Sequence, residues 1–201
     1  GTPGETEAVF SHSGLISQLT ASGSDAFYVV EDSGTSYQVW RSDGTTAGTV
    51  TLIAFPWLNA PAPKISVGDG CVFVAVGGRL WHSGRTPGGA VLVHESNVSI
   101  GALDTFGTMA YFDDGGRLYS SDGTVAGTVM LKNLASATGP GTVTQIALSG
   151  PTVFFTVLRY LTPSGYSAEL WTTDGTAAGT GLIKSFPDPV YSLGYLVAAQ
   201  S

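Results

Sequence analysis

Charge and cysteine are both scarce in this chain of 201 residues. Charged residues make up 11% of it, against about 25% in a typical soluble domain. Eight lysines and arginines stand against fifteen acidic residues, so a nucleic-acid backbone would find little positive charge to bind. The single cysteine, Cys71, excludes an internal disulfide, and packing alone is expected to hold the fold together.

Long apolar runs are missing as well. No stretch of roughly 18 apolar residues occurs, so we expect no membrane-spanning helix. No basic and apolar leader opens the sequence, and we expect any secretion signal to have been removed or never present. No 3.6-residue apolar period continues over the length of a helix, which favours an all-β fold.

Glycine, in contrast, is abundant, with 28 residues, roughly twice the usual share. Many of these glycines belong to a motif that first appears at residues 40–49 as WRSDGTTAGT. Full copies follow at residues 119–128 and 171–180, and a degenerate copy at residues 81–89 has Gly-Arg in place of Asp-Gly. A motif that returns about every 40 residues indicates a repeat architecture.

Each copy of the motif occupies the same place in a unit of four short strands. In the first unit, apolar or alternating runs are separated by turns rich in Gly, Asp and Ser. Four-stranded units of this length are typical of the blades of a β-propeller. We therefore predict one all-β propeller domain over residues 1–201, with whole blades at residues 15–55, 64–96, 98–134 and 142–186.

The two ends of the sequence predict a fifth blade. Residues 1–10 align with residues 85–93, so they are expected to form a fourth strand. Residues 189–201 resemble the first two strands of a unit, Val190–Leu193 and Tyr195–Ala198. We predict that these segments join in one blade and close a ring of about five blades, because an open ring would leave sheet edges exposed.

The third strand of that fifth blade does not occur in the sequence. Three explanations remain open: the blade lacks the strand, another chain supplies it, or the sequence is a fragment of a larger propeller. A strand from another chain would make the protein associate with itself through the incomplete blade.

The motif, written x-Leu-Trp-x-Ser-Asp-Gly-Thr-x-Ala-Gly-Thr, resembles the ELWKTDGTxxGT-type repeats of secreted bacterial propeller-like proteins. The resemblance covers nearly the whole chain, is specific in three of the four units and implies a secreted, bacterial-type protein. The position of the motif is also similar to that of the Asp-box of sialidase propellers, a structural turn remote from the catalytic site of those enzymes. Five blades resemble the tachylectin-2 type of lectin in blade count only. None of these resemblances assigns a ligand.

The Asp-Gly-Thr segments are expected to be structural turns, in which the aspartate bonds to the downstream backbone and the glycine supplies a positive φ. The residues concerned are Asp43, Gly44, Asp122, Gly123, Asp174 and Gly175. The alternative is a metal site, but one carboxylate per turn falls far short of the roughly six oxygens of a calcium site. We expect no metal and no cofactor.

One aromatic residue recurs on the third strand of every unit, and these four residues are expected to pack between blades. They are Trp40, Trp81, Tyr119 and Trp171. A sugar or cofactor site repeated at these residues is the alternative.

Signatures of catalysis are poor. The histidines show no metal-ligand spacing, and no G-x-S-x-G, P-loop or G-x-G-x-x-G motif occurs. His94 is expected in solvent, and Asp113-Asp114, which two glycines follow, is expected at a hairpin tip. We therefore predict that the protein is not an enzyme, and an enzyme with its site on the loop face is the weakest alternative.

In an up-and-down blade, the long irregular loops fall on the face opposite the Asp-Gly-Thr turns. Loops on a rigid scaffold are a common place for binding. Their aromatic and polar residues are candidates to stack on and hydrogen-bond a sugar: Trp57, Asn59, Tyr160, Tyr166, Asp188 and Tyr191. We predict a secreted, lectin-like module for carbohydrate or a cell-surface glycan. The alternatives are that Trp57 packs in the ring, and that the domain is structural or adhesive and recruits proteins or its own copies.

Overall fold

The computed structural model describes residues 8–9, 11–32, 34–56, 62–135, 139, 141–160 and 165–186. These residues form sixteen β-strands, which pair into four antiparallel sheets of four strands each. The predicted all-β fold with four-stranded units is therefore confirmed. The described part of the chain contains no helix that is long and apolar enough to cross a membrane.

Each sheet is one blade, and its strands follow one another in chain order. Blade 1 contains β1 (Leu15–Ser22), β2 (Asp25–Asp32), β3 (Ser36–Ser42) and β4 (Val50–Pro56). Blade 2 contains β5 (Lys64–Val67), β6 (Val72–Val76), β7 (Arg79–Ser83) and β8 (Val91–Glu95). Blade 3 contains β9 (Ile100–Phe106), β10 (Met109–Asp114), β11 (Arg117–Ser121) and β12 (Val129–Asn133). Blade 4 contains β13 (Gly141–Ser149), β14 (Thr152–Tyr160), β15 (Tyr166–Thr173) and β16 (Gly181–Phe186).

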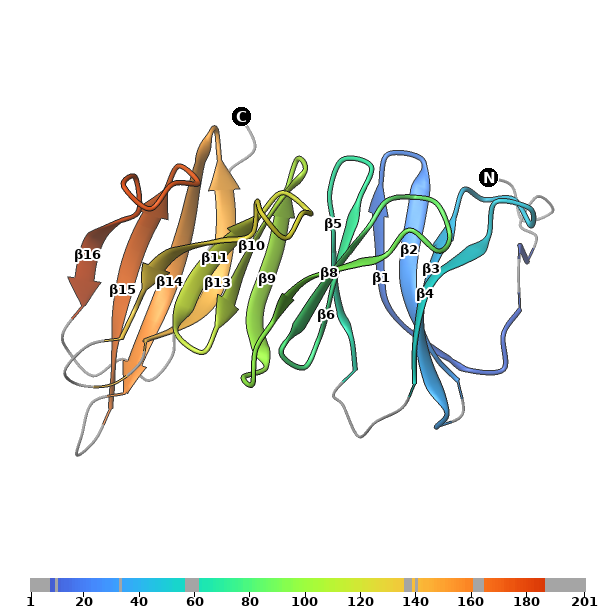
Figure 1. The fold of residues 1–201 in the computed structure, drawn as a ribbon, viewed down its shortest axis with the longest axis horizontal. Coiled ribbons are helices and arrows are strands. Elements are labelled where there is room, and N and C mark those ends of the chain that lie inside the picture. Colours follow the sequence, from blue (N-terminus) through green and yellow to red (C-terminus); the bar gives the residue numbers. More distant parts are fainter. Residues whose placement is uncertain are drawn as a thin grey trace.

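The four blades stand side by side in a row, with β1–β4 at one end and β13–β16 at the other (Figure 1). Neighbouring blades touch mainly through their first strands and much less through their outer strands. The blades are therefore wedged together at one side and splay apart at the other, as blades of a propeller do. The turns between third and fourth strands all lie along the upper edge of the array in Figure 1.

The predicted count of five blades is wrong for the described chain, which forms four. The segments expected to complete the fifth blade, residues 1–7, 10 and 187–201, lie outside the described residues. Ring closure is not seen either, because the first and last sheets stand at opposite ends of the array (Figure 1). Three wedge-shaped steps between blades do not turn the chain far enough to bring β13–β16 back to β1–β4.

The hydrophobic core consists of three clusters, each lying between two neighbouring blades. Alternate residues of one strand serve different clusters because successive side chains point to opposite faces of a sheet. In β6, for example, Val72 and Val74 pack against blade 1, whereas Phe73 packs toward blade 3. We call the sheet face toward the preceding blade the front face, and the face toward the following blade the back face.

The recurring aromatic residues lie on the front faces, as expected for packing between blades. Trp81 meets Phe55 of blade 1 edge-on, with ring centroids 5.8 Å apart. Tyr119 lies 4.8 Å from the ring of His94 in blade 2, and Trp171 lies under the ammonium group of Lys132 in blade 3 at 5.5 Å.

The Asp-Gly-Thr turns share one hydrogen-bond pattern. In blade 3, Asp122 Oδ1 accepts bonds from the N–H of Thr124 at 2.9 Å and from its hydroxyl at 2.7 Å. The same hydroxyl accepts a bond from the N–H of Gly127 at 2.9 Å. These bonds, with that of the threonine hydroxyl first, hold the pKa of each turn aspartate below its ordinary value. Matching bonds occur in the turns that begin at Asp43 and Asp174.

Glycine is required at two positions of each of these turns. The residue after the aspartate has a φ of 88° or 89°, in the left-handed region that favours glycine: Gly44, Gly123 and Gly175. The second position is five residues after the aspartate, where a Cβ would overlap the aspartate carboxylate. The glycines at this position are Gly48, Gly127 and Gly179. Blade 2 has no aspartate in its turn, and a Cβ at the matching Gly89 would meet only the carbonyl oxygen of Thr86, at 3.5 Å.

Blade 2 departs from the motif at Arg85, and the structure shows what that residue does instead. Its guanidinium reaches back to blade 1, where Nη1 lies 3.0 Å from Oδ2 of the buried Asp25. Asp25 also accepts a bond from Arg41 at 2.9 Å, which is the main cause that lowers the pKa of this carboxyl. Arg85 thus forms an ion pair between two blades, at a position where the other blades have a glycine and no side chain to do so.

Asp113 and Asp114 are buried, which corrects the expectation of an exposed hairpin tip. The reason is that β10 continues through Asp114, so that the two following glycines form the tip. Asp114 Oδ2 lies 3.0 Å from His94 Nε2, and Ser96 donates its hydroxyl to Asp114 Oδ1 at 2.6 Å. The expectation that His94 lies in solvent is therefore wrong, because its ring joins blade 2 to blade 3.

Asp113 is a buried acid whose carboxylate accepts backbone hydrogen bonds, including one from the N–H of Gly116 at 3.0 Å. Its removal from water raises its pKa from 3.8 to about 6. Because the folded state binds this proton more tightly than the unfolded state, protonation of Asp113 stabilises the fold. That contribution is complete below a pH of about 4 and is lost as the pH rises through about 6.

We expect Gly127→Ala to lower the free energy of unfolding by about 1–2 kcal/mol, because the new Cβ displaces the Asp122 carboxylate from its bonds to Thr124. Gly89→Ala, at the matching place in blade 2, is the control and should change stability by less than about 0.5 kcal/mol. Unfolding in urea measures both. Equal losses in the two variants would show that the aspartate does not hold the turn.

For Asp113, we expect a loss of up to about 3 kcal/mol in the free energy of unfolding between about pH 4 and about pH 7, since the shift spans roughly 2 pH units. Asp113→Asn carries no charge at any pH and can accept the same bond from Gly116, so it should lack this part of the pH dependence. Urea unfolding of both proteins across this range measures the difference. Parallel profiles of stability against pH would contradict the interpretation.

Candidate functional site

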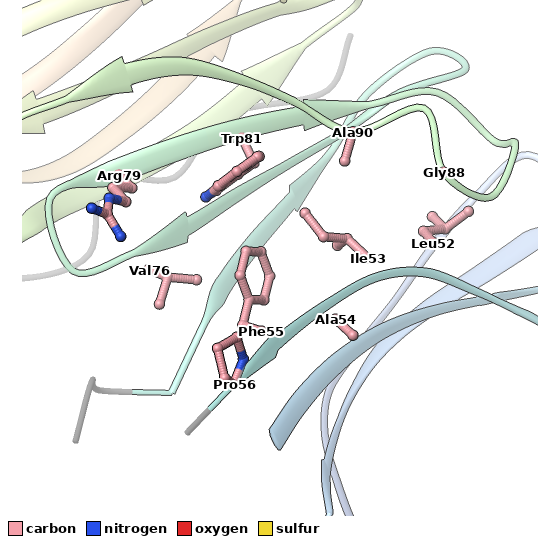
Figure 2. Close-up of a pocket in the computed structure, with 10 residues that line it drawn as sticks. All are labelled: Leu52, Ile53, Ala54, Phe55, Pro56, Val76, Arg79, Trp81, Gly88 and Ala90. Carbon is pink, nitrogen blue, oxygen red and sulfur yellow. The ribbon is translucent and has the colours of Figure 1, made fainter. Parts of the chain in front are cut away.

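A cavity of about 580 Å³ opens between blades 1 and 2. Figure 2 shows its walls, with the fourth strand of blade 1 on one side and, on the other, the second and third strands of blade 2 and the turn that precedes its fourth strand. Most of the lining is apolar, and it includes the rings of Phe55 and Trp81, which meet edge-on. A recess of this size, apolar with few polar groups, is typical of small-ligand sites.

The cavity lies where blade 2 departs from the motif. In blades 1, 3 and 4, a threonine at the start of the fourth strand shares a hydrogen bond of 2.7 Å with a hydroxyl at the end of the third: Thr49, Thr128 and Thr180. Blade 2 has Ala90 there, and Ser83 donates its hydroxyl to the Gly84 carbonyl instead. Ala90 and the nearby Gly88 leave open space, and both line the cavity (Figure 2).

Trp81 presents a hydrogen-bond donor to this cavity. The indole N–H of Trp40 donates to Gln38 at 3.1 Å, and that of Trp171 donates to Glu169 at 2.8 Å, two residues back on the same strand. In blade 2 the residue two back is Arg79, which has no acceptor, and no described residue accepts a bond from the Trp81 indole.

Arg79 stands at one end of the cavity, the end toward which the Trp81 ring nitrogen lies (Figure 2). Its guanidinium pairs with Glu95 at 2.7 Å, and both side chains are more than half exposed. The cavity therefore combines an aromatic wall, the indole N–H and, at one end, the solvated guanidinium of Arg79. Such a set of groups suits a ligand with a flat apolar face and oxygen atoms at its rim.

The loop-face residues predicted to bind sugar are only partly described. Tyr160 ends β14 and Tyr166 begins β15, and their exposed rings meet edge-on with centroids 5.6 Å apart. They lie in blade 4, whereas the cavity lies between blades 1 and 2, so they do not join the cavity. The other four lie outside the described residues: Trp57, Asn59, Asp188 and Tyr191.

Sequence reasoning did not single out Trp81 as a cavity-lining residue, since it placed it in the column of aromatics expected to pack and gave a repeated sugar site there only as the alternative. The signal that sets it apart is its partner position, where an arginine replaces the glutamine or glutamate of the other tryptophan-bearing strands. The substitution of alanine for the buried threonine was a second sign, because it removes side-chain volume at the same interface.

Acid–base chemistry has one candidate cluster in the described chain: His94, Asp114 and Ser96. Both His94 and Ser96 bind the carboxylate of Asp114, so the aspartate lies between them and the serine hydroxyl is not directed to the imidazole. A nucleophile needs its base within hydrogen-bond reach, and this order does not provide that. No group of three or more metal-ligating side chains occurs among the described residues.

No protein-family model matches this chain. No curated protein matches it either. Solved structures do: the computationally designed protein Ika8 is 16% identical with a TM-score of 0.56, over 87% of this chain and 50% of its own. Puromycin hydrolase is 14% identical with a TM-score of 0.57, over 87% of this chain and 29% of its own. The chain thus spans half the length of Ika8 and less of the hydrolase. At these identities the likeness shows the fold alone, which is propeller-like.

Proposed function

We propose that this protein is a non-enzymatic, secreted binding module that holds a carbohydrate ligand in the cavity between blades 1 and 2. The observation that carries the proposal is the Trp81 side chain, whose ring lines the cavity and whose N–H no described residue accepts. A buried or half-buried indole N–H normally has a partner, as it has in blades 1 and 4. A ligand oxygen would supply that partner.

The chemistry of the cavity suits a sugar ring. The C–H face of a sugar is apolar and stacks on an aromatic ring, while its hydroxyls bind donors and acceptors at the edge. Trp81 and Phe55 provide the aromatic surface, and Arg79, which is paired with Glu95, provides hydrogen-bond donors at one end. The ligand is a neutral sugar rather than a strongly anionic one, because Glu95 already neutralises Arg79 and the net charge of the chain is −7.

The exposed pair Tyr160 and Tyr166 is a second surface on which a sugar could stack. We place the ligand in the cavity instead, because a concave site buries more of a small molecule than an exposed edge does. The non-enzymatic part of the proposal is supported by the order of groups in the His94 cluster, although similar folds occur both in puromycin hydrolase and in a designed protein.

The variant Trp81→Phe tests the site, because it keeps an aromatic ring against Phe55 and removes only the donor. We expect saturable binding of at least one neutral oligosaccharide on a glycan array, with affinity roughly tenfold lower in Trp81→Phe, the effect of one hydrogen bond. Trp171→Phe is the matched control, since its N–H bonds Glu169 in a different interface. Calorimetry with the best ligand of the array measures all three proteins.

For this site, two outcomes would refute the proposal. One is an array that shows no saturable binding by the unaltered protein. The other is an affinity that falls equally in Trp81→Phe and Trp171→Phe, which would assign the loss to general weakening of the fold.

A further inference from the structure

The two outermost faces of the array are built like the faces that are buried inside it. Inside the chain, three interfaces each join the back face of one blade to the front face of the next. The same strand positions recur on the back face of blade 4 and on the front face of blade 1. No described blade covers either of these faces.

On the back face, the clearest marker is the bulge residue of the fourth strand. In blades 1 to 3 the shift in strand register identifies this residue, and it is 3–4% exposed in every case: Leu52, Val93 and Leu131. In blade 4 it is Ile183, which is 48% exposed. Phe186, three residues later, is 45% exposed, whereas Phe55 at the matching place in blade 1 is 8% exposed. Ile183 and Phe186 thus form a surface of the type that elsewhere meets another blade.

On the front face, the first strands give the same result. Ile100 and Val143 occupy matching places in β9 and β13 and are 3% and 2% exposed. The matching residue in β1 is Ile16, opposite Val30, and it is 61% exposed. Leu19, in the bulge of β1, is 72% exposed. Blade 1 therefore carries the apolar residues of an interface on the side where no described blade stands.

A contact at Trp40 shows which kind of residue this front face accepts. The ring of His12 meets Trp40 edge-on, with centroids 6.0 Å apart and an angle of 68°. Phe55 meets Trp81 in nearly the same way, at 5.8 Å and 63°. His12 therefore lies where a fourth-strand aromatic of a preceding blade would lie, and Phe186 is the fourth-strand aromatic that blade 4 offers.

We propose that a second copy of this chain covers these faces, with the back face of blade 4 in one copy packed against the front face of blade 1 in the other. In this contact Phe186 takes the place beside Trp40 that His12 holds, and the segment around His12 moves aside. The interface is continuous with the three inside the chain because it uses the same positions. A second copy suits both faces, because it carries the complementary face for each of them.

Two such contacts close a ring of two chains, related by a twofold axis. The twofold axis makes the two contacts equivalent, each joining a back face to a front face, and the pair covers both end faces of each copy. The described array matches half of the Ika8 chain, so an array of twice this length is compatible with a propeller-like fold.

The mass of the full chain in solution tests the proposal, and we expect twice the 20.6 kDa of one chain by light scattering. Ile183→Glu with Phe186→Glu removes the apolar back face, and Ile16→Glu with Leu19→Glu removes the front face. Each double variant alone should be a monomer, with a dissociation constant raised by roughly 100-fold. All four residues are exposed, so the variants should fold, as circular dichroism would show. Val125→Glu, exposed on a turn of blade 3, is the control and should remain a dimer.

Mixing the two double variants distinguishes this contact from other kinds of dimer. The mixture still contains one intact back face and one intact front face, so we expect a 1:1 dimer to form again. A front-face variant that stays dimeric on its own would indicate that two back faces pair, and would overturn the proposal. An unaltered chain that remains monomeric at about 100 µM, a concentration that reveals even weak dimers, would overturn it as well.

Discussion

Burial between neighbouring sheets is the interaction on which the rest of this structure depends. A single four-stranded blade has apolar residues on both faces and cannot remove them from water alone. Phe73 and Val74 are neighbours in one strand, yet they are buried in different clusters, on opposite sides of their blade. Each blade therefore needs two neighbours, and the turns, bulges and inter-blade ion pairs serve to place one blade on the next.

The strands and the motif turns could be predicted from the sequence because both depend on local chemistry. Asp122, Thr124 and Gly127 bind one another within six residues, so their spacing alone indicates the turn. The number of blades could not be predicted in this way. It depends on the angle at which blades pack, which no single motif encodes, and alignment of the two ends suggested a closure that the described sheets do not show. The burial of Asp113 was missed for a related reason, since the backbone of Val143 in blade 4, distant in the sequence, bonds to its carboxylate.

The candidate site shows how a repeat acquires a special position. Trp81 follows the same pattern as Trp40 and Trp171, and its period indicates packing. Two departures in blade 2 change its surroundings: Arg79 leaves its N–H without an acceptor, and Ala90 leaves space beside it. The loop residues chosen from the sequence rested on the general rule that variable loops bind ligands. The cavity lies between blades 1 and 2, at the place where blade 2 departs from the repeat.

Each blade contacts only its immediate neighbours, and this limits how such a chain can evolve. Because each described interface joins the same strand positions, duplication or loss of one whole unit leaves a complementary pair of faces on either side of the change. Partial units do not have this property, since they leave a strand without its sheet. The unit of exchange in this architecture is therefore the blade. Specific polar contacts between blades are exceptions, and one of them, the ion pair of Arg85 with Asp25, makes blade 2 specific for the blade before it. Exchange of blades 1 and 2 for other units would have to move them together.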